Sequence, residues 1–206
     1  GEHSARYRSL AQFFTGHNFV VAALDHNGHG YSEGVPGHVD SFADYLDDLS
    51  VFHRQISAQF TGVPMILLGH SMGGLIACNY LLGHQAEFAG AVLSGPAIKT
   101  DLQPGFIQMT LLRLLALLVP RLGMLKLDAA GVSRDPAVVK DYIADPLVYH
   151  GKMSARMLRE LFAGMDAVQA GASRITLPML ILHGGEDAMT SLEGSRFLQD
   201  HSGSSD

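Results

Sequence analysis

Short apolar runs and helix-like segments alternate along the chain. Four runs of strand length are almost entirely apolar: residues 19–24 (FVVAAL), 64–69 (PMILLG), 88–94 (FAGAVLS) and 177–183 (LPMLILH). Helices are expected around them, at residues 5–15, 42–60, 72–82 and 190–200. Such strands are typical of a parallel sheet that is covered on both faces. The alternation therefore predicts an α/β fold with a mostly parallel sheet.

The helix expected at 42–60 has the clearest signals. Its apolar positions recur at steps of three and four residues: Phe42, Tyr45, Leu49, Phe52, Ile56 and Phe60. Ser41, followed three residues later by Asp44, predicts a capping box at its start. We expect the helix to begin directly after Ser41.

Residues 97–174 interrupt the alternation. This stretch looks mainly helical, at about 106–119, 135–143 and 153–170, and contains no convincing strand. Crossovers within a sheet are far shorter, so the stretch is interpreted as an inserted helical cap. The expected organisation is an α/β core at 1–96 and 175–206, with the cap at 97–174.

Composition excludes several classes of protein. The net charge is −6, with 14 Lys and Arg against 20 Asp and Glu, which argues against a nucleic-acid partner. The single cysteine, Cys78, cannot form an internal disulfide, and the 11 histidines lack metal-ligand spacing. The apolar run 106–119 contains polar residues and stops at Pro120, so it is too short for a membrane span. No metal or organic cofactor is implied.

Residues 69–73 carry the strongest chemical signal. Gly69-His70-Ser71-Met72-Gly73 fits G-x-S-x-G, in which small residues let the chain turn sharply from a strand into a helix. An apolar run precedes the motif and a helix-like segment follows it, as this turn requires. A dinucleotide-binding or P-loop turn would need glycine patterns that the chain lacks. Ser71 is the candidate nucleophile, and the Met72 amide a candidate oxyanion donor.

A catalytic serine needs a histidine base and an acid that orients it. Two acids follow expected strands after Ser71: Asp187 in the loop Gly184-Gly185-Glu186-Asp187, and Asp101 farther beyond its strand. The two glycines in its loop and its shorter distance in sequence from the end of its strand favour Asp187. The alternative is that Asp187 is only a turn residue or helix cap.

Five strings together resemble the monoacylglycerol lipase family, in the same order and over essentially the whole chain. They are GEHSARY at the start, DHNGHGYSEG at 25–34, LLGHSMGG at 67–74, ADPLVYHG at 144–151 and LILHGGEDAM at 180–189. The resemblance implies an α/β-hydrolase fold, Ser71 as nucleophile, Asp187 as triad acid and a cap over an acyl-chain tunnel. Asn27 departs from the family, whose members usually have Arg there.

The resemblance also implies that part of the site lies outside this sequence. The family's triad histidine follows the acid by about thirty residues, beyond Asp206, and its second oxyanion donor precedes the GEHS string. His201 is too close to Asp187 in sequence to be the expected base. We therefore expect a fragment truncated at both ends, which lacks the triad histidine and is inactive alone.

Other residues have two interpretations each. The helix at 106–119 is either a lipid-facing lid surface or packed within the cap. His70, His183 and Cys78 adjoin the candidate site, but structural roles are favoured for all three.

The predicted function is hydrolysis of monoacylglycerol through an acyl-enzyme, with a lipid ester as the small-molecule substrate. A lysophospholipase or broad carboxylesterase is the alternative within enzymes, and a non-catalytic protein that binds lipid or a partner is the alternative of another class. We expect a cytoplasmic or peripheral membrane protein that contacts membranes transiently through the cap; any signal peptide would precede Gly1.

Overall fold

The computed structural model describes residues 2–102 and 104–205. They form two compact units, one made of residues 2–60 and 115–158 and the other of residues 61–102, 104–114 and 159–205. The first unit contains η1 (Ser4–Tyr7), α1 (Arg8–Thr15), α2 (Phe42–Gln59), β3 (Gly123–Leu125), η3 (Ala129–Val132), α5 (Pro136–Ala144) and β4 (Met153–Ser154). The second contains β1 (Ile66–His70), α3 (Met72–His84), η2 (Gln85–Glu87), β2 (Gly90–Ser94), η4 (Ala172–Arg174), β5 (Met179–Leu182) and α7 (Leu192–His201). Helices α4 (Phe106–Leu118) and α6 (Ala155–Gly171) each cross a boundary between the units.

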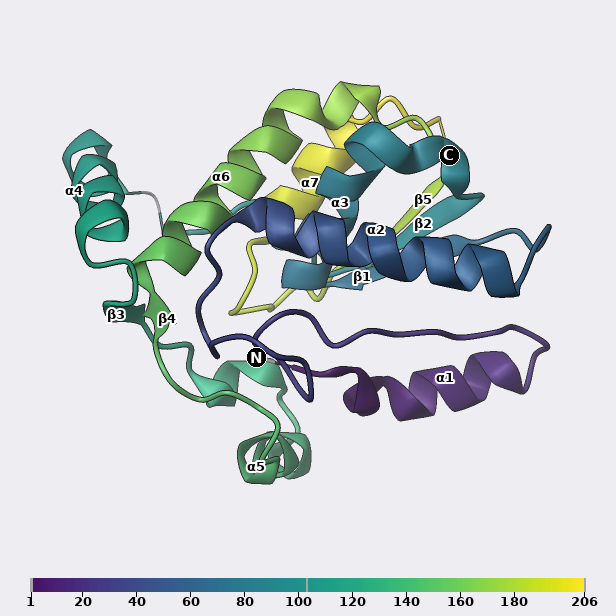
Figure 1. Ribbon diagram of the computed structural model, residues 1–206, viewed down its shortest axis with the longest axis horizontal. Helices are drawn as coiled ribbons and strands as arrows, with labels where there is room; N and C mark the ends of the chain where they lie inside the picture. Colours follow the sequence, from purple (N-terminus) through teal and green to yellow (C-terminus); the bar gives the residue numbers. More distant parts are fainter. Residues whose placement is uncertain (1, 103, 206) are drawn as a thin grey trace. The chain divides into compact units, whose positions relative to one another are not determined.

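The main sheet lies in the second unit and is entirely parallel (Figure 1). Its strand order is β1-β2-β5, with Leu67 beside Ala91 and Ala91 beside Met179. Helix α3 contacts β1 and helix α7 contacts β5. The α/β class and the parallel sheet are confirmed, and all three strands end at the edge where sites of such folds are built.

The two faces of this sheet differ in exposure. Leu93 is fully buried, as are Leu75 and Ile76 of α3. Residues on the opposite face remain exposed: Leu68 at 39% and Leu180 at 54%. Because successive residues of a strand point to opposite sides, only one face is well covered among the described residues. The expectation of two covered faces is corrected accordingly.

The expected strand at 19–24 does not form. These residues have no regular structure, and Phe19 and Val20 are more than half exposed. A strand is defined by its ladder, and among the described residues this run makes no ladder hydrogen bonds. Its apolar composition alone was therefore insufficient to predict a strand.

The predicted cap segment contains two short strands that the sequence analysis did not expect. Strand β3 pairs antiparallel with β4, and Gly123 lies beside Ser154. The two form a separate sheet, apart from the main one. Strands of three and two residues are too short to show an alternating pattern, and their partners are distant in sequence. The three expected helices are α4, α5 and α6; the boundaries of the cap stay a prediction.

Helix α2 begins as the sequence predicts. The Ser41 hydroxyl accepts from the Asp44 amide and the Ser41 amide donates to the Asp44 carboxylate at 3.1 Å, so both arms of the capping box are present. The same hydroxyl also accepts from the Ala43 amide at 3.2 Å. Tyr45 is fully buried, and its hydroxyl lies 3.5 Å from Met157 Sδ. The helix thus anchors the core of the first unit.

Candidate active site

Ser71 lies at a sharp turn between β1 and α3. Its backbone has φ 52° and ψ −119°, a conformation that residues other than glycine rarely adopt. Strain of this kind costs about 1–3 kcal/mol and persists only when the surroundings impose it. The expected turn from strand to helix is therefore present, with Ser71 at its apex.

The loop after β2 holds this turn in place. The Ser71 amide donates to the Ser94 carbonyl at 3.0 Å, and the Ser71 carbonyl accepts from the Ala97 amide at 3.0 Å. The same carbonyl also accepts from Gly74 and Leu75 in the first turn of α3. Within the part of the chain that the structure describes, no partner is found for the Ser71 hydroxyl. The Ser71 backbone is thus fixed by hydrogen bonds, while the Ser71 hydroxyl makes none among the described residues.

The glycines around Ser71 have different roles. A Cβ atom on Gly69 would lie 2.5 Å from the Gly73 carbonyl oxygen, so this position has no room for a side chain. A Cβ on Gly74 would lie 2.7 Å from that of Pro96. A Cβ on Gly73 would meet nothing within 4 Å. The sequence motif assigned the tight packing to Gly69 and Gly73, whereas the structure assigns it to Gly69 and Gly74.

The different packing of Gly69 and Gly73 gives a prediction for the full-length protein. We expect Gly69→Ala to lower kcat by about 10²-fold, because the turn must shift and misplace the Ser71 hydroxyl. Gly73→Ala is the matched control and should change kcat by less than about two-fold, since alanine suits a helix better than glycine. Steady-state ester hydrolysis measures both. Equal losses in the two variants would contradict this account.

The Met72 amide lies at the start of α3. Among the described residues it makes no hydrogen bond, as is expected for the first amides of a helix. The partial positive charge of the helix N-terminus adds to its ability to bind an anion. The arrangement suits an oxyanion donor beside the Ser71 hydroxyl, as the sequence suggested.

Asp187 follows β5 and is held by its own loop. Its Oδ1 accepts from the amides of Met189 at 2.7 Å and Thr190 at 3.0 Å. Its Oδ2 accepts from the Thr190 hydroxyl at 2.9 Å. Partial burial raises the pKa of Asp187, but these hydrogen bonds outweigh burial and hold the net pKa below its ordinary value. The carboxylate is therefore ionised at neutral pH.

Gly95 connects this carboxylate to the Ser71 turn. It follows Ser94, whose carbonyl accepts from the Ser71 amide, and its own amide donates to Leu182 at the end of β5. A Cβ on Gly95 would lie 3.1 Å from Asp187 Oδ2. Its φ of 49° also favours glycine. Ser71 and Asp187 thus flank the same short loop.

The other candidates lie in different surroundings. Asp101 is exposed. The His201 ring stacks on Phe197 and bonds the Phe197 carbonyl at 3.0 Å, so it belongs to α7. His70 Nδ1 donates to the Ser94 carbonyl at 2.9 Å, in a structural role. Cys78 is fully buried, which raises the pKa of its thiol to about 12 and suits packing rather than reaction.

Sequence reasoning missed the partners of Asp187. Thr190 bonds both carboxylate oxygens, and the buried His183 lies beside it, with Nε2 3.2 Å from the Thr190 carbonyl. A threonine three residues after an aspartate, just before a helix, was the available signal. The sequence analysis favoured a structural role for His183 next to the candidate site, but its bonds to Thr190 and Ser195 could not be read from the sequence.

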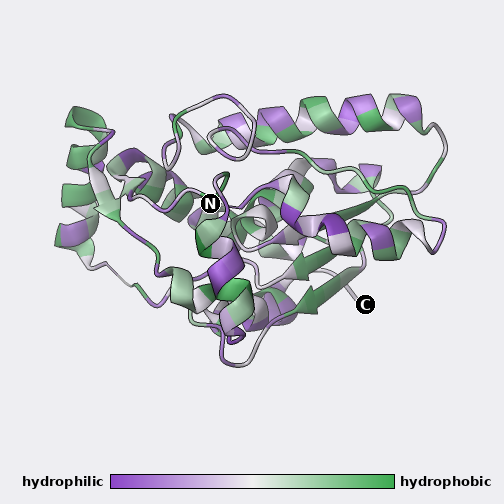
Figure 2. Ribbon diagram, turned by 90° about the horizontal axis from the view of Figure 1, so that it is seen from below, coloured by the Kyte–Doolittle hydropathy of each residue, from purple (hydrophilic) through white to green (hydrophobic). Residues whose placement is uncertain are grey.

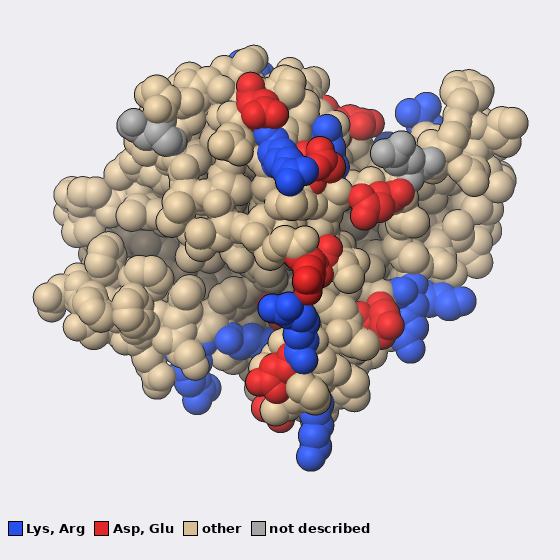
Figure 3. All heavy atoms as spheres, turned by 180° about the vertical axis from the view of Figure 1, so that it is seen from behind, with Lys and Arg blue, Asp and Glu red and all other residues tan. Residues whose placement is uncertain are grey.

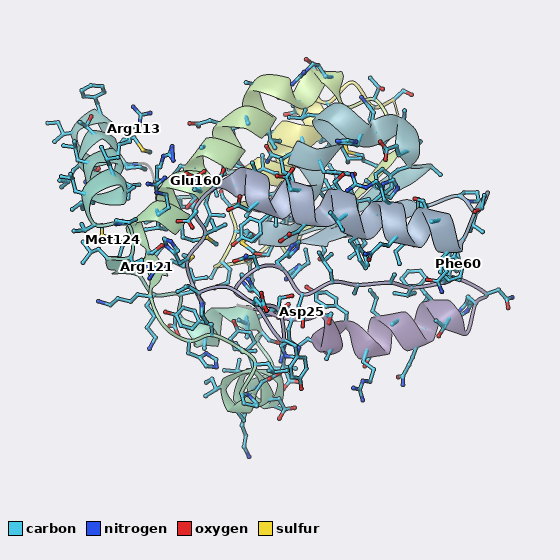
Figure 4. All side chains as sticks on the ribbon, viewed as in Figure 1. Asp25, Phe60, Arg113, Arg121, Met124 and Glu160 are labelled. Carbon is cyan, nitrogen blue, oxygen red and sulfur yellow. The ribbon has the colours of Figure 1, made fainter. Side chains whose placement is uncertain are left out.

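The polar loop after residue 24 is organised by Asp25 (labelled in Figure 4). Its carboxylate accepts from the Ser4 amide at 2.7 Å and from the Tyr31 amide at 2.9 Å. Burial raises the pKa of Asp25, but the two amides, together with the Ser4 hydroxyl and the nearby His3, outweigh this effect and lower the pKa overall. Asn27 lies in the same loop against Gly34, where a Cβ would come within 2.2 Å of its Oδ1.

A hollow of about 570 Å³ lies in the first unit, along residues 133–144, and neither Ser71 nor Asp187 lines it. The cavity expected above Ser71 therefore stays a prediction. Acidic and basic side chains lie next to one another on the face shown in Figure 3. No helix in the described part of the chain is both long and apolar enough to cross a membrane.

Comparison with known proteins identifies the family. The family model described as "Serine aminopeptidase, S33" matches residues 1–206. A monoacylglycerol lipase from Mycolicibacterium smegmatis is 37% identical over 205 residues, which are 100% of this chain and 73% of that protein. The chain belongs to the monoacylglycerol lipase family.

Two further relatives agree with this assignment. The monoglyceride lipase of Rattus norvegicus is 31% identical over 207 residues, covering 100% of this chain and 68% of that protein. The crystal structure of the Paleococcus ferrophilus monoacylglycerol lipase matches with a TM-score of 0.88 at 33% identity, covering 100% of this chain and 78% of that one. The α/β-hydrolase fold is confirmed.

Proposed function

We propose that this member of the family hydrolyses monoacylglycerols through an acyl-enzyme, with Ser71 as nucleophile and Asp187 as triad acid. The observation that carries the proposal is the Ser71 turn, in which a strained backbone presents an unused hydroxyl beside the Met72 amide. The lipase relatives support the choice of substrate.

The reaction follows from these groups. Ser71 Oγ attacks the ester carbonyl, its proton passes to a histidine, and the carbonyl oxygen becomes an anion that accepts from the Met72 amide. The tetrahedral intermediate collapses, the histidine protonates the departing glycerol oxygen, and the acyl group stays on Ser71. Water, activated by the same histidine, then releases the fatty acid and regenerates the serine.

We propose that this histidine and the second oxyanion donor come from outside residues 1–206. His70, His183 and His201 each use ring nitrogens in hydrogen bonds of their own. None of these bonds involves the Ser71 hydroxyl. The three histidines are therefore assigned to the scaffold.

The test uses the full-length protein and three esters: a monoacylglycerol, a lysophospholipid and a short-chain ester. A higher kcat/KM on the monoacylglycerol supports the proposal, and a preference for the lysophospholipid establishes the alternative enzyme. A fluorophosphonate probe, followed by peptide mass spectrometry, identifies the reactive serine. Absence of both turnover and labelling in the folded protein establishes the non-catalytic binding protein.

We further propose that α4 contacts a lipid surface. Large apolar side chains on it are unusually exposed, including Ile107 at 82% and Leu118 at 73%. Figure 2 shows that most of this helix is hydrophobic. Residues 107, 111, 114 and 118 recur at helical spacing, so they share one face. Such a face suits insertion at the boundary between headgroups and acyl chains.

Charged substitutions on α4 should weaken this contact. We expect Ile107→Glu and Leu118→Glu each to lower partitioning onto phosphatidylcholine vesicles by about ten-fold or more, because each replaces an exposed apolar side chain that would insert among the lipids with a charged one. Val63→Glu, at another exposed apolar position, is the control and should leave partitioning unchanged. Vesicle co-sedimentation measures all three. Unchanged binding in both α4 variants would assign the exposed residues to packing within the protein.

A further inference from the structure

The loop that carries Asp187 contains a chain of polar contacts outside the described reaction. Ser195 Oγ lies 2.7 Å from His183 Nδ1, and His183 Nε2 lies 3.2 Å from the Thr190 carbonyl and 3.3 Å from Thr190 Oγ1. The Thr190 hydroxyl then lies 2.9 Å from Asp187 Oδ2. His183 has only 3% of its side chain exposed. These four residues are called the Asp187 network below.

The partners determine the direction of each bond. A carbonyl oxygen can only accept, so His183 Nε2 must carry a proton and donate to Thr190. In the neutral ring, Nδ1 then accepts from the Ser195 hydroxyl. The Thr190 hydroxyl gives its proton to Asp187 Oδ2, because an ionised carboxylate cannot donate. Every bond of the network therefore runs toward Asp187.

The network also distinguishes the two carboxylate oxygens. Oδ1 accepts from two backbone amides, which use both of its lone pairs. Oδ2 accepts from the Thr190 hydroxyl and has one lone pair left. His183 Nε2 is 3.6 Å from Oδ2, too far for a hydrogen bond. Oδ2 also adjoins Gly95, on the side of the loop that bonds the Ser71 turn.

We propose that Thr190, held by His183 and Ser195, positions the Asp187 carboxylate so that the remaining lone pair of Oδ2 receives the N–H of the catalytic imidazole. Thr190 and His183 are positioning residues, since they act on the reaction through Asp187. This proposal rests on the proposed role of Asp187 as triad acid. It also explains why a buried histidine lies beside the acid without being the base.

The main test compares Thr190→Val with Thr190→Ser in the full-length enzyme. Valine has the shape of threonine without the hydroxyl, so kcat should fall about ten-fold while KM changes little. Serine keeps the hydroxyl and should restore most of kcat. Thr176→Val is the matched control, because its hydroxyl bonds Gln85 at the other end of β5. Full kcat in Thr190→Val would overturn the proposal.

A double variant separates positioning from a general structural effect. If Thr190 acts through Asp187, adding Thr190→Val to Asp187→Asn should change kcat by less than about two-fold. The same ten-fold loss on that background would show that Thr190 acts elsewhere and would overturn the proposal. Full activity of Asp187→Asn alone would instead refute the proposed triad acid. The two failures are therefore distinguishable.

The role of His183 is tested by removing or keeping the N–H group that it donates to Thr190. His183→Leu removes the bond to Thr190 and should lower kcat, whereas the amide nitrogen of His183→Gln can still donate to the Thr190 carbonyl and should restore part of it. His84→Gln is the control, since His84 pairs with Glu87 beyond the C-terminal end of α3. Equal kcat in His183→Leu and the unmodified enzyme would exclude His183 from the network's function.

Discussion

Replacing Ser71 by alanine in the full-length enzyme is expected to lower kcat on a monoacylglycerol by about 10⁶-fold, the loss typical of removing a serine nucleophile. No covalent intermediate can then form, and only transition-state binding by the oxyanion donors remains. The fold should be retained, because the hydrogen bonds that hold this turn involve the backbone of Ser71.

Two measurements check this result. Fluorophosphonate labelling should disappear together with turnover, while the melting temperature changes little. Ser57→Ala is the matched control, since its hydroxyl bonds the His53 carbonyl within α2 and both activities should persist. Labelling that survives in Ser71→Ala would mean that another serine is the nucleophile.

Asp187→Asn is expected to lower kcat by about 10⁴-fold, the loss typical of an acid-to-amide change in a triad. The side-chain oxygen of the new asparagine should take the position of Oδ1, where the backbone amides of Met189 and Thr190 donate. The NH₂ group then occupies the Oδ2 place and offers a donor where the imidazole needs an acceptor. The histidine would be held in the wrong tautomer.

Asp101→Asn is the control for this variant and should retain kcat within about two-fold, because Asp101 is exposed. The kcat and KM of both variants on one ester decide between the acids. If Asp101→Asn lost activity while Asp187→Asn retained it, the assignment would be reversed.

Several features of the fold were predictable because they depend on neighbours in sequence. The Ser41 capping box was read from residues three positions apart and is present at the start of α2. The apolar runs that became β1, β2 and β5 were bounded by turn residues. The spacing of G-x-S-x-G predicted the turn at Ser71, and the backbone there has the positive φ that this turn needs.

Other features depended on residues far apart in the chain. The run at 19–24 is as apolar as the strands, yet it forms none, because a strand requires a partner. Strand β3 pairs with β4 across an intervening helix. Gly74 is required by Pro96 rather than by the motif itself.

The same division applies to the candidate site. Motif spacing, together with the resemblance to the monoacylglycerol lipase family, proposed Ser71, Met72 and Asp187, which all lie near the edge where the parallel strands end. Only the tertiary structure showed that His183 bonds Thr190 and which oxygen of the carboxylate remains open. The bond from Thr190 to Asp187 joins residues three positions apart and is local, whereas the bond from Ser195 to His183 joins residues twelve positions apart. The second bond depends on the packing of α7 against β5 and its loop, which no local pattern of residues determines.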